Sequence, residues 1–324
     1  MYDTDIEFIN RGHCTEVACG VFNLDRSFEK KFSVMNINIR SLKSNFSGLL
    51  KFLNSISAPP TVIVVTESWL SDDTVKFYDI PGYRKEFMNR ASIGGGILMY
   101  YCSALTATRH AKLTGIFPTH ESLCVTLKGP NVSYKLLCIY RPPNRDNESD
   151  FVKYFQSLQK RSLGANCICV GDFNLCTMGG SLSKSKKSAA FNTCMLGKNF
   201  ENAITYPTFY SYLGNASLLD HTWYNGSTKY KSFVFDAPIA DHCPTLCVFM
   251  TDDILPDQVI TFRDFSDKNI IAMTALLPRY VANLNECLAR EPDLDNKICL
   301  LDQWFHEILN RHFPIMKKPL PLND

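Results

Sequence analysis

A series of short apolar runs, separated by polar and turn-forming residues, predicts that the chain up to about residue 250 is largely β-structure. The runs are rich in Val, Ile, Leu, Tyr and Cys, as expected of strands that are buried on one or both faces. The predicted strands occupy residues 32–39, 61–65, 96–101, 122–127, 135–140, 167–170, 218–224 and 245–250. Strands therefore outnumber helices in this part of the chain.

Two amphipathic helices are predicted among these strands. Apolar residues recur at helical spacing over residues 42–56, and the pattern ends before a Pro-Pro pair. A second helix is expected over residues 151–158, after a cap at Ser149 or Asp150. Helices scattered among many strands favour an α+β fold of two packed sheets with helices outside, more than a parallel βαβ sheet.

The pattern changes in the last part of the chain. Residues 270–287 and 298–312 carry apolar side chains at helical spacing, and a loop-like, Pro-rich segment follows them. We therefore expect a helical appendage without chemistry of its own. The predicted organisation is an N-terminal extension over 1–29, a main domain over 30–252 and the helical segment over 253–324.

Charge does not identify a binding partner. The 34 Lys and Arg residues nearly balance the 32 Asp and Glu residues, so affinity for nucleic acid would require a local basic patch. The basic segment 181–187 is predicted to be an exposed loop; a solvated turn is favoured over a contact with a DNA backbone. Gly94 to Gly96 resemble a phosphate-binding loop, but no helix start or Lys follows, which favours a flexible hairpin.

The 13 cysteines favour a reducing compartment, because many lie inside apolar runs where a free thiol packs as a small hydrophobe. Cys167 with Cys169 and Cys243 with Cys247 are closely spaced, but neither pair has a matching second pair. Packed thiols are therefore favoured over a zinc site. The chain shows no signal-peptide pattern at its start and no apolar stretch of about 18 residues. We expect a soluble, intracellular protein.

Polar residues follow several of the predicted strands, where a rigid scaffold would present them to a cleft. Metal-assisted cleavage of a phosphodiester needs oxygen ligands for Mg²⁺, a carboxylate to activate water and donors for the phosphoryl oxygens. Each residue alone has another explanation, such as a helix cap, a surface acid, a turn or a local ion pair. The residues in question are Asn38, Glu67, Asp172, Asn174, Asp241 and His242.

The short motifs around these residues resemble, in order, those of the endonuclease/exonuclease/phosphatase superfamily, which includes apurinic endonucleases and deoxyribonuclease I. They read NIRSL, TESWL, GGGILMYY, IYRPPN, VGDFN, SLLDH and ADH, and they cover roughly residues 30–250. The motif sequences are most similar to those of the endonuclease of non-LTR, LINE-type retrotransposons. The C-terminal segment resembles the connector that leads to a reverse transcriptase. The resemblance implies a four-layer α/β/β/α sandwich of two mainly antiparallel sheets.

The resemblance also implies a metal site. Glu67 matches the metal-ligating Glu, Asn38 the Asn that helps to hold metal and phosphate, and Asp241 a second carboxylate of the site. The expected ion is Mg²⁺, with Mn²⁺ as the alternative.

Catalytic roles carry over in the same way. Asp172 matches the Asp that positions or deprotonates the attacking water, and facing a cation it is expected to stay ionised near neutral pH. Asn174 matches the Asn that orients the scissile phosphate, and Tyr140 matches a Tyr that contacts it. Asp220 matches the acid that pairs with the terminal His, which is His242. Such a pair fixes the imidazole tautomer and favours its protonated form.

Two positions depart from the family pattern. Ala240 stands where the family usually has Ser, and Pro143 stands where apurinic endonucleases have Asn, with Asn144 one step later. Neither change removes an expected metal ligand or the expected base.

The leading hypothesis is a Mg²⁺-dependent endonuclease that nicks one DNA strand and leaves a 3′-hydroxyl. Its expected partners are DNA and a reverse transcriptase domain of the full-length element, with no membrane; we expect a monomer in the nucleus. One alternative keeps the site but changes the substrate, to abasic DNA or an inositol phosphate. Another is an inactive, DNA-binding remnant of a retroelement.

Overall fold

The computed structural model describes residues 12–17, 28, 31–56, 59–90, 94–143, 147–179, 185–237, 239–251 and 259–319. The chain divides into two compact units, Met1–Pro256 and Asp257–Asp324. The first unit holds both large sheets and all the residues predicted to carry chemistry.

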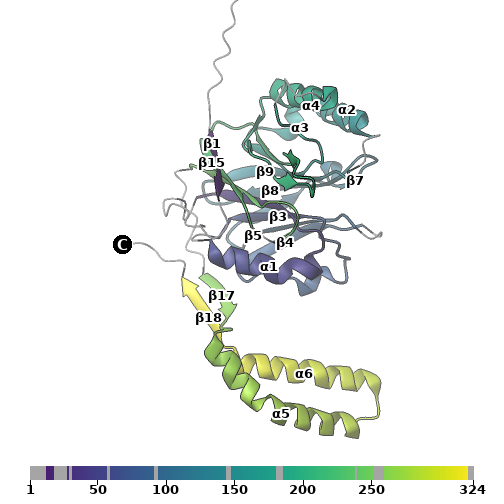
Figure 1. Ribbon diagram of the computed structural model, residues 1–324, viewed down its shortest axis with the longest axis vertical. Coiled ribbons are helices and arrows are strands. Elements are labelled where there is room, and N and C mark those ends of the chain that lie inside the picture. The colour runs from purple at the N-terminus through teal and green to yellow at the C-terminus, as the bar shows by residue number, and fades with distance from the viewer. Residues whose placement is uncertain are drawn as a thin grey trace, which may run out of the picture. The chain divides into compact units, whose positions relative to one another are not determined.

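The first sheet of this unit has seven strands (Figure 1). Their spatial order is β1 (Gly12–Val17), β15 (Tyr230–Phe235), β16 (Thr245–Phe249), β2 (Ser33–Asn38), β3 (Val62–Thr66), β5 (Ile97–Cys102) and β4 (Tyr83–Met88). The pairs β1–β15 and β2–β3 are parallel, and the other neighbours are antiparallel. β1 lies within the segment expected to be an extension, and it forms an edge strand of this sheet.

The second sheet is built in the same mixed manner. It runs β11 (Glu201–Asn202), β14 (Asp220–Tyr224), β10 (Cys167–Asp172), β9 (Ser133–Tyr140), β8 (Glu121–Lys128) and β6 (Thr106–Arg109), with β7 (Gly115–Ile116) paired to β8. Only β9–β10 is parallel among these pairs. A separate small hairpin joins β12 (Phe209–Tyr210) to β13 (Ala216–Ser217).

Helices cover the outer faces of the two sheets, which gives the expected four layers (Figure 1). α1 (Leu42–Ser55) packs Leu49 and Phe52 against outward residues of the first sheet such as Met35. Phe151 and Phe191 belong to the helices on the second sheet. Those helices are α2 (Glu148–Ser157), α3 (Lys160–Leu163) and α4 (Lys186–Gly197). The α+β sandwich predicted from the sequence is therefore confirmed.

The space between the sheets holds a third apolar core. Val34 and Val64 of the first sheet lie there with Leu136 and Val170 of the second, each no more than 1% exposed. Central strands are thus buried on both faces, and this explains their nearly continuous apolar runs. All the predicted strands are present within one or two residues of their expected bounds.

Several local predictions need correction. α2 begins at Glu148 with Asn147 at its N-cap position, so the expected cap at Ser149 or Asp150 is wrong. The predicted basic loop ends in a helix, because the Ser185 hydroxyl accepts a hydrogen bond from the Ser188 amide and caps α4; residues 181–184 lie outside the described residues.

The glycine segment and the short 3₁₀ turns complete the first unit. Gly94 to Gly96 have positive φ angles and lie between the antiparallel strands β4 and β5, as expected for a hairpin. The 3₁₀ turns span Val75–Phe77 and Ala111–Leu113. The described cysteines are free thiols, and most of them, including Cys167, Cys169 and Cys247, are buried.

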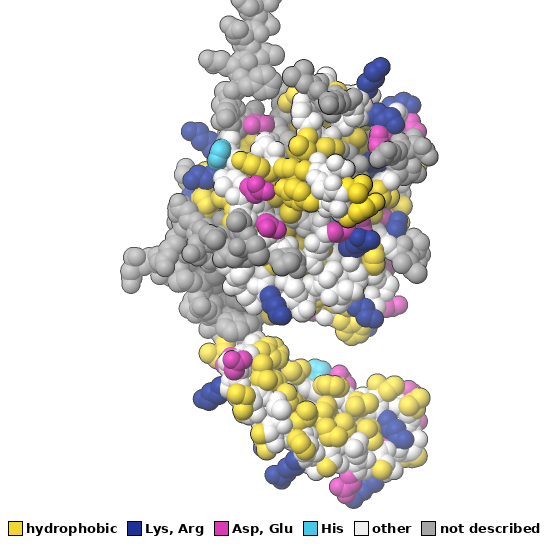
Figure 2. All heavy atoms as spheres, viewed as in Figure 1, with side chains coloured by type: hydrophobic (Ala, Val, Ile, Leu, Met, Phe, Trp, Pro, Cys, Tyr) yellow, Lys and Arg dark blue, Asp and Glu magenta, His cyan; other side chains and the backbone are white. Residues whose placement is uncertain are grey.

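The second unit contains the two predicted helices, α5 (Asp267–Arg290) and α6 (Leu294–His312), and an unpredicted antiparallel pair, β17 (Val259–Arg263) with β18 (Ile315–Pro319). Apolar side chains cover much of the visible face of the two helices (Figure 2). The most exposed include Ile271, Leu294, Ile298 and Phe305. No helix in the described ranges is long and apolar enough to cross a membrane.

Candidate active site

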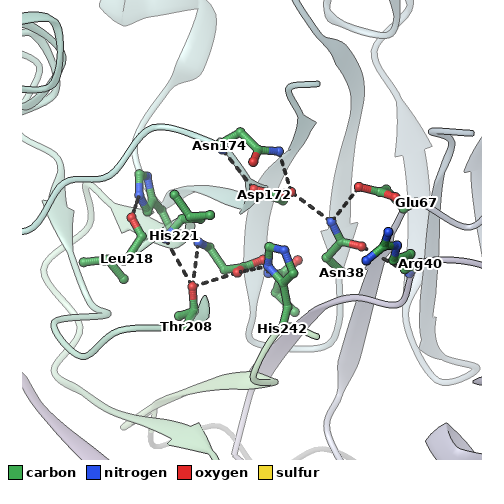
Figure 3. A network of polar contacts seen from close by, with 12 residues as sticks. Asn38, Arg40, Glu67, Asp172, Asn174, Thr208, Leu218, His221 and His242 are labelled. Atoms are coloured by element: carbon green, nitrogen blue, oxygen red, sulfur yellow. Dashed lines mark hydrogen bonds and ion pairs between the residues drawn. The ribbon is translucent and has the colours of Figure 1, made fainter. Parts of the chain in front are cut away.

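The predicted site residues lie at one edge of the two packed sheets, and the sheet topology explains why. β2 and β3 are parallel, so Asn38 and Glu67 leave the first sheet at the same edge. In the second sheet Asp172 is paired in register with Tyr140 of β9 and with Asp220 of β14. Carboxyl ends of parallel strands meet at one edge, so residues far apart in the sequence converge here (Figure 3).

A network of amide and carboxylate groups joins the two sheets (Figure 3). The Asn38 Nδ2 group donates to Glu67 Oε1 and to Asp172 Oδ2, at 2.9 Å in each case. Asn174 donates through its amide N to Asp172 Oδ1 at 2.9 Å and through Nδ2 to Oδ2 at 2.8 Å. The Tyr140 hydroxyl donates to Glu67 Oε1 at 3.1 Å. Both carboxylates are thus oriented by donors from neighbouring strand ends.

Beside this network lies a buried histidine–aspartate pair. His242 Nδ1 is 2.7 Å from Asp220 Oδ2, and the same oxygen accepts the Thr208 hydroxyl at 2.7 Å. Asn36 Nδ2 donates to the other oxygen, Oδ1, at 3.2 Å. Because a carboxylate accepts at Nδ1, the imidazole carries a proton there, and its Nε2 is left for a substrate. The ring also lies 5.0 Å from that of Phe209.

Asp241 has a different surrounding from the other predicted residues. Its carboxylate forms an ion pair with Arg40 at 2.6 Å, and both side chains are partly exposed, at 36% and 62%. Arg40 also donates its backbone N–H to Asn38 Oδ1 at 3.1 Å. Asp241 is therefore connected to the site by its ion pair with Arg40. To act as a metal ligand, as predicted, it would have to leave that ion pair.

Burial and mutual repulsion set the protonation of the network. Burial and the nearby Asp220 raise the pKa of Asp172 to about 7, although His242 and the hydrogen bonds from Asn174 and Asn38 oppose the rise. The expectation of an ionised Asp172 at neutral pH thus depends on a cation, whose charge would lower this pKa. Burial, with the charges of Glu67 and Asp172, holds the pKa of Tyr140 far above its usual range, so Tyr140 is a neutral donor.

His242 shows the opposite balance. Burial alone would lower its pKa, but the charge of Asp220, the hydrogen bond to it, and the charges of Asp172 and Asp241 raise the pKa to about 10. The imidazole is therefore protonated at neutral pH and offers a positively charged Nε2–H donor.

The ligand atoms present at the site fit a hard divalent cation. Asp172, Asp220 and His242 have potential ligand atoms within 4.8 Å of one another, but Asp220 already accepts from three side chains, so this grouping is better described as a hydrogen-bonded pair. Glu67 and Asp172 offer carboxylate oxygens, which Mg²⁺ and Mn²⁺ prefer. Asn38 donates its side-chain amide nitrogen to both carboxylates and therefore orients them. Its oxygen, the atom that could bind a cation, accepts the Arg40 backbone N–H instead.

Arg141 is a site residue that was not predicted from the sequence motifs. It is 1% exposed, and its guanidinium donates to the Phe173 carbonyl at 2.7 Å and to the Asn174 carbonyl at 2.5 Å. Asn174 Nδ2 in turn donates to the Arg141 carbonyl at 2.8 Å. Arg141 thus holds the turn that carries Asp172 and Asn174. Its position directly after Tyr140, in the YRPP part of the IYRPPN motif, could have indicated a role at the site.

Glu121 supports the other side of the site. It is 2% exposed, accepts the Gly96 amide at 2.6 Å and lies 3.1 Å from Arg90. The Gly96 carbonyl accepts the amide of Ser68, directly after Glu67. Glu67 itself has a φ of 53°, a left-handed conformation that needs such support. Glu121 therefore fixes the segment that presents Glu67, and no pattern in the sequence indicated it.

The comparisons with known proteins agree with this fold. Residues 35–267 match the model of the endonuclease/exonuclease/phosphatase family, whereas no curated protein matches the chain at a significant level. Among solved structures, the endonuclease domain of TRAS1, a telomere-specific non-LTR retrotransposon, is similar at 15% identity and a TM-score of 0.53, over 68% of this chain and 98% of that one.

Two further nucleases are similar to a comparable extent. The 3′-5′ exonuclease of Neisseria meningitidis aligns at 12% identity and a TM-score of 0.54, over 67% of this chain and 99% of its own. The apurinic endonuclease of Leishmania major aligns at 15% and 0.53, over 70% and 89%. These likenesses show the fold, and the family match spans most of the chain. The chain therefore belongs to the endonuclease/exonuclease/phosphatase family.

Proposed function

We propose that this chain is a divalent-cation-dependent DNA endonuclease of the retrotransposon type, which nicks one strand and leaves a 3′-hydroxyl. The observation that carries the proposal is the convergence of two oriented carboxylates, Glu67 and Asp172, with a protonated His242 at one edge of the fold. A proton acceptor and a charged donor within one site are what hydrolysis of a phosphodiester needs.

The carboxylates are the groups that would hold the cation, with Mg²⁺ favoured and Mn²⁺ as the alternative. Glu67 uses Oε1 to accept from Asn38 and Tyr140, which leaves Oε2 without a partner among the residues that the structure describes. When bound, a divalent cation stabilises negative charge that develops on the phosphate. Its charge would also keep Asp172 ionised.

Asp172 is the proposed base. Two of its neighbours, Asn38 and Asn174, donate to Oδ2, and the Asn174 amide donates to Oδ1, so the carboxylate cannot rotate away from an attacking water. A fixed carboxylate with a pKa near neutrality can accept a proton from water during attack. Asn174 donates its two Nδ2 hydrogens to Asp172 and to the Arg141 carbonyl, so it holds the base in place, and orienting the phosphate would require it to exchange one of these partners.

His242 and Tyr140 are the proposed donors to the phosphoryl oxygens. His242 is held by Asp220 through Nδ1 and donates through Nε2, while Tyr140 remains a neutral phenol. Asp220 pre-orients His242, which is how a donor lowers the barrier for charge development. The single hydroxyl proton of Tyr140 is donated to Glu67, so in this proposal Tyr140 exchanges that contact for the phosphate when substrate binds.

DNA is the proposed substrate because of the surroundings of the site and the similar proteins. Tyr210 and Tyr212, 47% and 97% exposed, belong to the hairpin segment next to His242 and could pack against sugars or bases. One similar structure is the TRAS1 endonuclease domain, and another is a Neisseria 3′ phosphatase described as bound to a product DNA hairpin. We further expect a nuclear, monomeric enzyme that acts with a reverse transcriptase.

The test is incubation of the purified chain with supercoiled plasmid, with Mg²⁺, Mn²⁺ or EDTA. We expect nicked circles only with a divalent cation, and nicks that a DNA polymerase extends without prior phosphatase treatment, as a 3′-hydroxyl requires. Asp172→Asn should abolish nicking, whereas the matched exposed change Asp302→Asn should have no effect. Cleavage confined to abasic plasmid would favour a repair substrate. DNA binding without cleavage, unchanged by Asp172→Asn, would indicate an inactive remnant and refute the proposal.

A further inference from the structure

β1 is an addition to the matched part of the family fold. The family match begins at residue 35, but Gly12 to Val17 pair in parallel with β15 over six residues, and the Asp236 amide donates to the Val17 carbonyl at 3.0 Å. The strand therefore extends the first sheet beyond β15.

The buried side of β1 forms a small core of its own. Cys14 is 6% exposed and packs with Ile204, Leu218 and Val234, against the partly buried Cys243. Ile204 and Leu218 immediately flank the segment that contains the β12–β13 hairpin, and Cys243 directly follows His242. This cluster lies apart from the three larger cores, so β1 supplies apolar cover at the base of the hairpin.

The same face of β1 contacts the hairpin itself, because Glu16 stands two residues after Cys14 on the strand. The Tyr210 hydroxyl donates to Glu16 Oε1 at 3.2 Å. The preceding residue, Phe209, forms a β-bridge with His242, and the Thr208 carbonyl accepts the Cys243 amide at 2.7 Å. One strand of the hairpin is thus attached to the catalytic pair and also to β1.

A hairpin with strands of two residues cannot hold its own conformation in water. Its contacts at the Asp–His pair fix the start of β12, but the exposed Tyr210 and Tyr212 beyond it depend on other support. In the described part of the chain, the Tyr210 side chain makes its hydrogen bond to Glu16.

We infer that β1 supports the site. Cys14 and Glu16 act as positioning residues that hold the β12–β13 hairpin beside His242 in the orientation that receives substrate. This inference rests on the proposed function for its consequence in catalysis, but the positioning itself is a property of the free protein. Loss of the contacts should weaken substrate binding and leave the chemical step nearly unchanged, because neither residue reaches the proposed catalytic groups.

Hydrogen–deuterium exchange of residues 205–217 in the full chain tests the positioning without requiring activity. Glu16→Ala and Tyr210→Phe should each speed exchange about two- to five-fold, since each removes one exposed hydrogen bond, and the double variant should show no further increase. Glu16→Gln keeps an acceptor oxygen and should behave as the unmodified chain. Thr15→Ala, an exposed change on the same strand, is the matched control.

Plasmid nicking then tests the consequence. Glu16→Ala should raise KM about two- to five-fold with kcat within two-fold, and Cys14→Asp, which places a charge in the small core, should enlarge the effects on exchange and KM. If Cys14→Asp fails to fold, Glu16→Ala and Tyr210→Phe still decide the question. Unchanged exchange in both of these variants would overturn the inference, whatever the activity. Faster exchange in a chain that never nicks DNA would uphold the positioning and refute the proposed function.

Discussion

Replacement of Arg141 by Met should both destabilise the protein and slow cleavage. The guanidinium is buried and donates to two backbone carbonyls, those of Phe173 and Asn174, and to Asn147 Oδ1 at 3.1 Å. It also lies 3.7 Å from the Glu148 carboxylate. Met fills a similar volume but supplies none of these donors, so their acceptors are left in the interior.

The size of the effect follows from these contacts. A hydrogen bond to a charged group contributes about 1.5–3 kcal/mol, and removal of one member of a buried charged network costs about 3–5 kcal/mol. Because the partners here include two carbonyls beside the proposed base, we expect a loss of about 3–5 kcal/mol from a total stability of about 5–15 kcal/mol. The turn that carries Asp172 and Asn174 would also loosen, and we expect nicking to fall by about ten-fold or more.

Urea denaturation followed by fluorescence measures the stability, and plasmid nicking under folded conditions measures the activity. Arg109→Met is the matched control, since its side chain is 44% exposed and pairs with Glu86 at 3.6 Å, so it should cost less than about 1 kcal/mol. An Arg141→Met chain that unfolds within 1 kcal/mol of the unmodified one, at unchanged activity, would refute the assignment of Arg141 as the support of this turn.

The remaining predictions concern the cation, the Asp–His pair and a close backbone contact. Glu67→Gln should abolish cation-dependent nicking and shift the urea midpoint little, because it removes charge at the mouth of the site and not in the core. His242, whose pKa is raised from 6.5 to about 10, should contribute stability that is complete below pH 6.5 and is lost as pH rises toward 10. The melting temperature of the unmodified chain should thus fall more steeply over this range than that of His242→Gln, and parallel curves would contradict the pairing. Gly171→Ala should destabilise the fold by several kcal/mol, because its Cβ would lie 1.9 Å from the Ile139 carbonyl oxygen at a φ of 140°; a normal melting curve would contradict this geometry.

The sequence predicts the central strands well because they are buried on both faces and read as continuous apolar runs. The edge strands are different. In β4, only Met88 is buried, and three of its six residues, Arg84, Lys85 and Glu86, are charged. β15, which lies next to the edge strand β1, is also mixed, because buried and less buried positions alternate around Lys231. Such mixed strands are defined by their backbone partners, and the pattern of side chains along one strand contains little of that information.

The same reasoning explains which site residues were predicted. Asn38, Glu67 and Asp172 stand at the ends of recognisable strands, so their convergence could be anticipated from strand order and the resemblance. Asn36 and Arg141 act on partners 184 and 32 residues away, Asp220 and the Phe173 carbonyl. A buried polar side chain has no local pattern that identifies a distant partner, and for this reason the contacts of Asn36 and Arg141 emerge only from the structure.

The site also explains why both sheets are required. Asn38 belongs to the first sheet and Asp172 to the second, and a single side-chain amide spans the distance between them. The separation of the sheets is set by the apolar core between them, in which Val34, Val64 and Val170 are no more than 1% exposed. Interiors are close-packed and do not deform continuously, so this core fixes the gap that Asn38 must bridge. The geometry of the proposed base and of Glu67 is thus determined by packing many residues away from the chemistry, as well as by the hydrogen bonds at the edge.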